Sequence, residues 1–244
     1  MIMKIKDINI NYEREGSSNN KTIVFLHGWG QNIEMMKPLA KAFYDSNDVV
    51  IIDLPGFGKS EEPKEALEIK DYADIVHELL DKLEIKKPSL VGHSFGGRVS
   101  IYYSSIYDVE KVVLLSSPYK NDMNANSLKN RILRNAKKVP VLKNFEELAK
   151  QLLGSEDYKN ASPMMRKILV NTVNTDLTEN AKKIKAPTIL IWGTGDSAVS
   201  YKTQKELENL IPDAALIEYP GLSHYAYLEN LGQTINIIKN FIEN

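Results

Sequence analysis

Short apolar runs alternate with longer amphipathic stretches along most of this chain. Most of the runs are continuous apolar blocks, which is typical of strands covered on both faces of a parallel sheet. The runs lie at Ile23–Leu26, Val49–Ile52, Ser89–Val91, Val112–Leu115, Thr188–Ile191 and Ala215–Ile217.

The segments between these runs have helical periodicity. Apolar residues recur at helical spacing from Tyr72 to Leu83 and again from Leu231 to Ile242, which predicts two amphipathic helices packed on the sheet. The first segment, Ile5–Tyr12, instead alternates over part of its length and predicts an antiparallel edge. The whole pattern predicts an α/β fold with a doubly wound, mostly parallel sheet.

The alternation stops between residues 119 and 183. This stretch has no strand-like run and contains three or four helical patterns. It is also long for a connection between two strands, so we expect a helical cap (119–183) inserted into a core formed by residues 1–118 and 184–244. Between Lys129 and Lys143 the cap is basic, with no acidic residue, and the simplest interpretation is a solvated face.

Composition excludes several kinds of chemistry. The 244 residues include no cysteine, which excludes a disulfide framework, a thiol nucleophile and thiolate-bound metal. Only four histidines are present, at 27, 77, 93 and 224, so we expect no metal site and no cofactor. The formal net charge of −1 gives no reason to expect nucleic-acid or membrane binding. Without a secretory leader or membrane-spanning run, we expect a cytoplasmic monomer or homodimer.

The motif G-x-S-x-G occurs at Gly92–Gly96, with Ser94 at its centre. A strand-like run leads into the motif and a helical pattern that begins at Gly97 leads out of it. A serine on such a sharp strand-to-helix turn is exposed as a nucleophile, and the turn needs small neighbours because the backbone is strained. The placement therefore favours a nucleophile over a simple packing turn.

A second glycine-rich turn, His27–Gly30, follows the strand Ile23–Leu26. Such a turn can aim a backbone N–H at the same point as the N–H that follows the serine. We therefore expect the backbone N–H groups of Trp29 and Phe95 to form an oxyanion hole.

A serine nucleophile needs a base and an orienting acid. His77 lies on the predicted helix, and His27 and His93 lie inside the two glycine turns, which leaves His224 as the best base. Asp196 follows the strand Thr188–Ile191 and is the preferred acid, because ligands collect at the carboxyl edge of such sheets. Asp122 remains the rival acid, and Asp53 is interpreted as a turn former whose carboxylate accepts loop N–H groups.

These motifs together resemble the α/β-hydrolase superfamily over essentially the whole length. The resemblance rests on His27–Gly30, Asp53–Ser60, Gly92–Gly97, Ala186–Asp196 and the loop at His224. It implies Ser94 as nucleophile, His224 as base, Asp196 as its orienter and a variable helical cap. Relatives often carry Pro where Ser200 stands and Gly where Ser223 stands, which affects loop geometry and supplies no catalytic atom.

The leading hypothesis is a carboxylesterase-like hydrolase that cleaves a small to medium ester or thioester. Arg98, together with the basic cap, suggests an anionic substrate instead and resembles the lyase-type synthase of menaquinone biosynthesis, which keeps the same triad. A perhydrolase and a non-enzymatic ligand receptor are further alternatives. Substrate-binding candidates are His27, Gly28, His93, Arg98, Met123, Phe145, Met164 and Met165.

Overall fold

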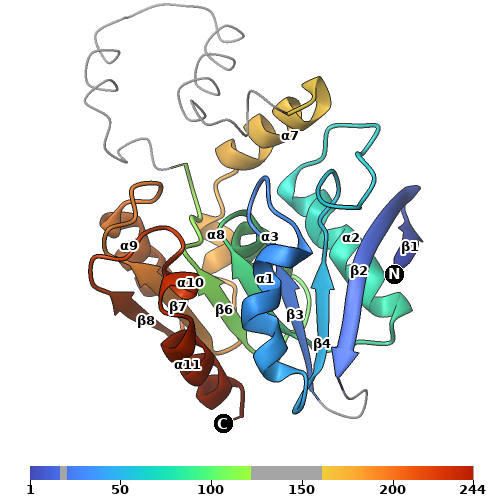
Figure 1. The fold of residues 1–244 in the computed structure, drawn as a ribbon. Coiled ribbons are helices and arrows are strands. Elements are labelled where there is room, and N and C mark those ends of the chain that lie inside the picture. The colour runs from blue at the N-terminus through green and yellow to red at the C-terminus, as the bar shows by residue number, and fades with distance from the viewer. Residues whose placement is uncertain (17–20, 122–160, 244) are drawn as a thin grey trace, which may run out of the picture.

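The computed structural model describes residues 1–16, 21–121 and 161–243. The described strands form one eight-stranded sheet in the order β1-β2-β4-β3-β5-β6-β7-β8 (Figure 1). Strand β2 pairs antiparallel with β1 and β4, and all other neighbours are parallel. The strands are β1 Ile2–Ile5, β2 Ile8–Gly16, β3 Thr22–Leu26, β4 Asp48–Ile52, β5 Ser89–His93, β6 Val112–Leu115, β7 Thr188–Gly193 and β8 Ala214–Tyr219.

The predicted antiparallel edge is present, but as a hairpin of two strands. Lys6 and Asp7 connect β1 to β2 with φ angles of 43° and 64°. Left-handed backbone is costly for such residues, and hairpin turns that need it usually carry Asn or Gly. The turn therefore had no recognisable signal in the sequence.

Apolar side chains of the parallel strands alternate between two separate cores. In β3, Val24 and Leu26 join one apolar cluster, whereas Ile23 and Phe25 join the cluster on the opposite face. Because helices cover both faces, nearly every position of β3, β4, β5, β6 and β7 is buried, which explains the continuous apolar runs. The predicted doubly wound, mostly parallel sheet is confirmed.

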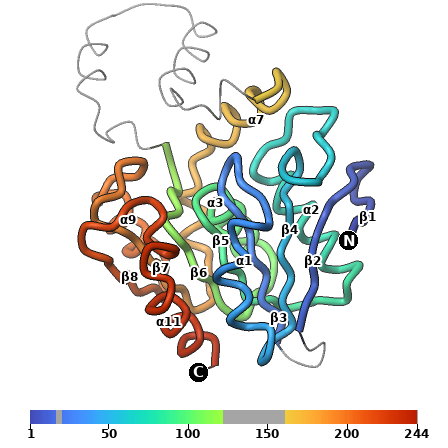
Figure 2. Tube along the Cα trace, in the orientation of Figure 1, coloured from blue at the N-terminus to red at the C-terminus, as the bar shows by residue number. Residues whose placement is uncertain are grey.

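Helices lie on both faces of the sheet. The first face carries α2 (Ile69–Lys82), α3 (Phe95–Ser104) and α9 (Tyr201–Leu210), which contribute side chains to one cluster. The other face carries α1 (Ile33–Ala40), the 3-10 turn η1 (Lys41–Phe43), α10 (Ala226–Glu229) and α11 (Leu231–Glu243). Helices α1 and α11 lie side by side there (Figure 2). Both helices predicted from periodicity are present, as α2 and α11.

The described part of the inserted segment contains α7 (Pro163–Asn174) and α8 (Thr178–Ala181) and no strand. Helix α7 lies beyond the carboxyl ends of the parallel strands (Figure 1). The chain enters the inserted segment at Tyr119 and leaves α7 toward Leu177. These two connecting segments, called the stems, meet where the Leu177 N–H donates to the Tyr119 carbonyl over 2.8 Å. The cap at 119–183 and the core boundaries at 1–118 and 184–244 stay predictions, because the basic run and most of the segment lie outside the described residues.

Within the described ranges, no helix has the length and apolar character needed to cross a bilayer. The same residues contain no group of three or more His, Asp or Glu side chains placed to hold a metal ion.

Candidate active site

Ser94 sits on the sharp turn between β5 and α3, at the carboxyl edge of the sheet. Its φ and ψ angles are 49° and −107°, in a region that non-glycine residues rarely adopt. The Ser94 N–H donates to the Leu115 carbonyl of β6 over 2.9 Å, which holds the strained residue in place. This strand-to-helix turn is the backbone arrangement that exposes a nucleophilic serine.

Three glycines provide the space for this turn. A Cβ atom on Gly92 would lie 2.6 Å from the Gly96 carbonyl oxygen, and one on Gly96 would lie 2.2 Å from the Leu26 carbonyl oxygen. On Gly97 the added atom would lie 1.8 Å from the Ser117 hydroxyl oxygen. The motif predicts small neighbours on both sides of Ser94. The three glycines meet this need, because any side chain there would collide with neighbouring atoms.

The glycine-rich turn after β3 is joined directly to the start of α3. The Gly96 N–H donates to the His27 carbonyl over 3.0 Å. The Trp29 and Phe95 rings pack edge to face with centroids 5.3 Å apart, and Tyr72 packs edge to face on Phe95 at 5.0 Å. Within the described residues, no acceptor is found for the N–H of Trp29 or Phe95. Aromatic packing therefore holds both residues, and among the described residues both N–H groups stay available to a ligand.

Asp196 and His224 form a hydrogen-bonded pair. The Nδ1 atom of His224 lies 2.8 Å from Oδ2 of Asp196. The Trp192 indole N–H donates to the same oxygen over 3.0 Å, and the N–H groups of Ala198 and Val199 donate to Oδ1. The Asp196 side chain is 1% exposed and that of His224 is 18% exposed. A buried, fully hydrogen-bonded carboxylate therefore orients a ring that remains open to solvent.

His93 connects this pair to the serine turn. The residue directly precedes Ser94, and its ring lies 5.0 Å from the His224 ring between centroids. Its Nε2 atom is 3.1 Å from the His224 carbonyl oxygen. The structure thus brings the loop of His224 and Asp196 to the same edge of the sheet as Ser94.

The comparisons with known proteins agree with this geometry. A family model for the alpha/beta hydrolase fold matches residues 21–140 and 125–231. The chain belongs to the alpha/beta hydrolase family.

Relatives within this family are hydrolases, which supports hydrolase activity on a small molecule. The chain is 26% identical to Lipase 1 of Psychrobacter immobilis, over 94% of this chain and 79% of that protein. It is 24% identical to a 2-(acetamidomethylene)succinate hydrolase of Mesorhizobium japonicum, over 97% and 92%. The structure of an enol-lactonase from Burkholderia xenovorans LB400 matches the whole of both chains with a TM-score of 0.81 at 20% identity, which shows the shared fold.

Three predicted substrate-binding positions of this alpha/beta hydrolase are buried or hydrogen-bonded within the protein. His27 is fully buried, and its Nε2 accepts the Leu54 N–H over 3.0 Å while Nδ1 donates to the Gly28 carbonyl. The Gly28 N–H donates to Oε1 of Gln31, and His93 is fully buried as well. Close packing of the two turns explains these contacts, and a role of the three positions in substrate binding stays a prediction.

Arg98, also predicted to bind substrate, lies among backbone carbonyls. Its guanidinium, 4% exposed, donates to the Pro118 carbonyl over 3.1 Å, to the Thr172 carbonyl over 2.8 Å and to the Thr175 carbonyl. Burial lowers its pKa to about 10, so the group is still charged at neutral pH. Arg98 neutralises the carbonyl end of α7 and ties both stems of the inserted segment to α3.

The four apolar pocket candidates divide into three cases. Met165 is a core residue, because its side chain is 4% exposed and its sulfur fills the space beside Gly56. Met164 is half-buried on α7 and stays a prediction. Met123 and Phe145 lie outside the described residues, as does Asp122, the rival acid.

The predicted role of Asp53 as a turn former is confirmed. Its carboxylate accepts the N–H groups of Ile33 and Lys59 over 2.7 and 2.8 Å, and a Cβ atom on Gly58 would collide with it. His77 stacks on Tyr107, and its Nδ1 lies 3.2 Å from the hydroxyl of Tyr103, near the C-terminal end of α3.

Sequence reasoning missed two supporting residues. Trp192, in β7, donates to Asp196, and Gln31, one residue after the glycine turn, accepts the Gly28 N–H. Gln31 carries no motif signal, because its role depends on which side chains the fold brings beside it.

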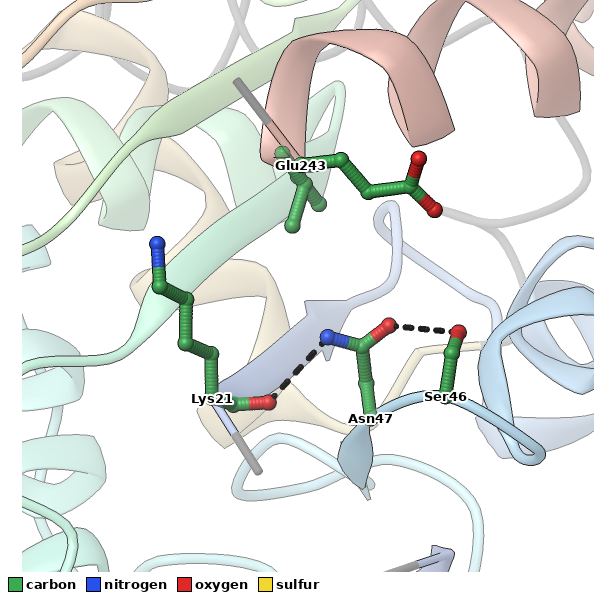
Figure 3. A pocket seen from close by; sticks show the side chains of 5 residues that line it. Lys21, Ser46, Asn47 and Glu243 are labelled. Carbon is green, nitrogen blue, oxygen red and sulfur yellow. Dashed lines mark hydrogen bonds between the residues drawn. The ribbon is translucent and has the colours of Figure 1, made fainter.

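A shallow pocket also lies at the opposite edge of the sheet, where β3 and β4 begin. Figure 3 shows the Asn47 amide donating to the Lys21 carbonyl and the Ser46 hydroxyl donating to Asn47, over 3.3 and 2.9 Å. Ile242 and Glu243 complete its lining. It contains no pairing of a nucleophile with a base, so the candidate site remains the carboxyl edge.

The contact at Gly96 yields a first prediction. Gly96→Ala should lower the free energy of unfolding by about 1–3 kcal/mol, because the added methyl group must push apart the turn after β3 and α3. Gly232→Ala is the matched control: no atom lies within 4 Å of its added Cβ, and stability should be unchanged or slightly higher. Urea unfolding measures both variants, and equal stability of the two would contradict the prediction.

The buried histidines predict a dependence of stability on pH. Burial lowers the pKa of His27 to about 4 and that of His93 to about 3, with the His224 ring adding to the latter shift. Below about pH 6.5 the unfolded chain binds protons that the folded chain does not, so stability is complete above that pH and falls as the pH decreases. From about pH 7 to about pH 5, urea unfolding should show a loss of roughly 1–2 kcal/mol for each ring. A flat profile over that range would contradict neutral, buried rings.

Proposed function

We propose that this chain is a serine hydrolase that cleaves a small to medium carboxylic ester or thioester. The observation that carries the proposal is the strained Ser94 turn at the same sheet edge as the hydrogen-bonded Asp196–His224 pair. The order Ser94, Asp196, His224 along the chain is the order expected on α/β-hydrolase sheets.

In the proposed first step, the Ser94 hydroxyl oxygen attacks the acyl carbon and its proton passes to Nε2 of His224. The bond from the acyl carbon to the leaving oxygen or sulfur then breaks, and Nε2 returns the proton to that leaving atom. Asp196 accepts the Nδ1–H, so that Nε2 has the lone pair that the reaction needs. The acyl group remains on Ser94.

The backbone N–H groups of Trp29 and Phe95 are proposed to hold the negative charge that develops on the acyl oxygen. Support comes from their lack of an acceptor among the described residues and from the aromatic packing that fixes both residues. Donors held in advance stabilise such a charge because they need not reorganise during the reaction. Water then attacks the acyl carbon, gives a proton to His224, and Ser94 leaves with that proton.

Two classes of substrate remain as proposals. Similarity to Lipase 1 supports a neutral ester, and similarity to the 2-(acetamidomethylene)succinate hydrolase supports a substrate that bears carboxylates. The menaquinone-synthase-like lyase is less favoured, because Arg98, the residue that suggested it, donates to three backbone carbonyls. A perhydrolase would use the same three residues, and a ligand receptor would keep them without turnover.

The nucleophile is tested by Ser94→Ala. Ester hydrolysis should fall by about 10⁴-fold or more in kcat/KM, and labelling by a fluorophosphonate should disappear from the intact-protein mass spectrum. Ser46→Ala, at the exposed opposite edge of the sheet, is the matched control and should keep full activity and labelling. Undiminished hydrolysis by Ser94→Ala would overturn the proposal.

The substrate class is tested with paired esters of equal acyl length. We expect a p-nitrophenyl ester with a neutral acyl chain to have the higher kcat/KM, by at least about 10-fold, over the ester whose acyl chain ends in a carboxylate, because an unpaired charge in a protein site is costly to desolvate. A carboxylate-rich lyase substrate forms the third arm. Preference for the anionic ester would favour the second class, and elimination without ester cleavage would favour the lyase.

A further inference from the structure

Gln31 is at the meeting point of the three segments that form the site. Its Oε1 atom accepts the Gly28 N–H over 3.0 Å, within the turn that also carries Trp29. Its Nε2 atom donates to the Tyr225 hydroxyl over 3.3 Å, on the residue that follows His224. Gln31 lies on neither the serine turn nor the histidine loop, and it spans 194 positions of sequence to reach Tyr225.

His93 makes the second connection between these segments. Both of its ring nitrogens face oxygens, Oε1 of Gln31 at 3.2 Å and the His224 carbonyl at 3.1 Å, and a neutral ring carries only one N–H. Oε1 of Gln31 already accepts the Gly28 N–H. The His224 carbonyl accepts no other hydrogen bond from the described residues, so the ring proton is assigned to Nε2. His93 therefore hydrogen-bonds the histidine loop, and its Nδ1 only packs against Oε1 of Gln31.

The packing leaves little freedom around this cluster. A Cβ atom on Gly28 would lie 2.8 Å from Nδ1 of His93 and 3.0 Å from Oε1 of Gln31. The His93 ring also packs against the rings of Tyr225 and Tyr227, with centroids 5.4 and 4.9 Å away. A shift of the Gln31 amide would therefore move both the Gly28 turn and the loop that carries the base.

We propose that Gln31 is a positioning residue that, together with His93, sets the placement of the Trp29 N–H and the His224 base relative to Ser94. Among the described residues Gln31 makes no hydrogen bond to Ser94, Asp196 or the His224 ring, so it acts through Gly28 and Tyr225. The inference rests on the proposed serine hydrolase function, because it assigns what is positioned.

Two variants of nearly equal length separate the polar contacts from the volume of the side chain. Gln31→Met removes both hydrogen bonds and keeps the length of the side chain. Gln31→Glu keeps an oxygen that accepts the Gly28 N–H, and a second oxygen that accepts a hydrogen bond from the Tyr225 hydroxyl. Gln233→Met makes the same chemical change at an exposed position of α11 and serves as the control.

The readouts are steady-state kcat and KM for p-nitrophenyl acetate, the rate of Ser94 labelling by a fluorophosphonate, and the thermal unfolding midpoint. Gln31→Met should lower kcat and the labelling rate by roughly 10- to 100-fold, with KM within about 2-fold, because misplaced groups cost rate rather than binding. Gln31→Glu should recover most of the loss, and Gln233→Met should behave as wild type.

Tyr225→Phe tests the same connection from its other end. It removes only the hydroxyl that Gln31 contacts, so a smaller fall in kcat is expected, and the double variant Gln31→Met/Tyr225→Phe should lose less than the product of the two single effects. Independent, multiplying effects would show that Gln31 does not act through Tyr225 and would overturn that part of the proposal.

Three results would overturn the role of Gln31 as a whole: wild-type kcat in Gln31→Met, an equal loss in Gln31→Met and Gln31→Glu, or a raised KM with kcat unchanged. Failure of the underlying function is a distinct outcome, because the wild-type chain itself would then take no label on Ser94.

Discussion

The hydrogen bond from the Gly96 N–H to the His27 carbonyl is the constraint on which the site depends. It joins the first turn of α3 to the turn after β3, and it forms only because Gly96 has no side chain: a Cβ atom would lie 2.2 Å from the Leu26 carbonyl oxygen. The contact places the residue after Ser94 beside the turn that carries Trp29. Two segments far apart in sequence, the turn after β3 and the start of α3, are thereby held against each other.

The sheet topology makes this contact possible. Strand β5 lies beside β3, whereas β4 lies on the other side of β3, so the order of winding reverses between them. Carboxyl ends of strands at such a reversal leave room for a ligand, and here they carry the two glycine turns. At the same edge, the buried Arg98 guanidinium donates to the carbonyl groups of Pro118 and Thr172. It thereby attaches the C-terminal end of α7 to α3.

The histidines show how environment divides the roles of one residue type. His27 and His93 are fully buried, and burial holds their pKa values far below the usual range, so they serve as neutral hydrogen-bonding parts of the framework. The His224 side chain stays 18% exposed beside a buried carboxylate. The proposed role of His224, which is to take up and return a proton, requires this openness, whereas the two framework rings stay neutral because they are buried.

The sequence by itself determined the sheet, its winding and the candidate nucleophile, base and acid, because continuous apolar runs and glycine turns are local signals. Tertiary structure decided the rest. Arg98 appeared free for a substrate until Pro118, Thr172 and Thr175 were seen to surround it, and the Lys6–Asp7 turn had no marker because its left-handed backbone is imposed by strand pairing. The connections made by Gln31 likewise exist only after distant loops meet, since a hydrogen bond across 194 positions leaves no periodicity or motif in the chain.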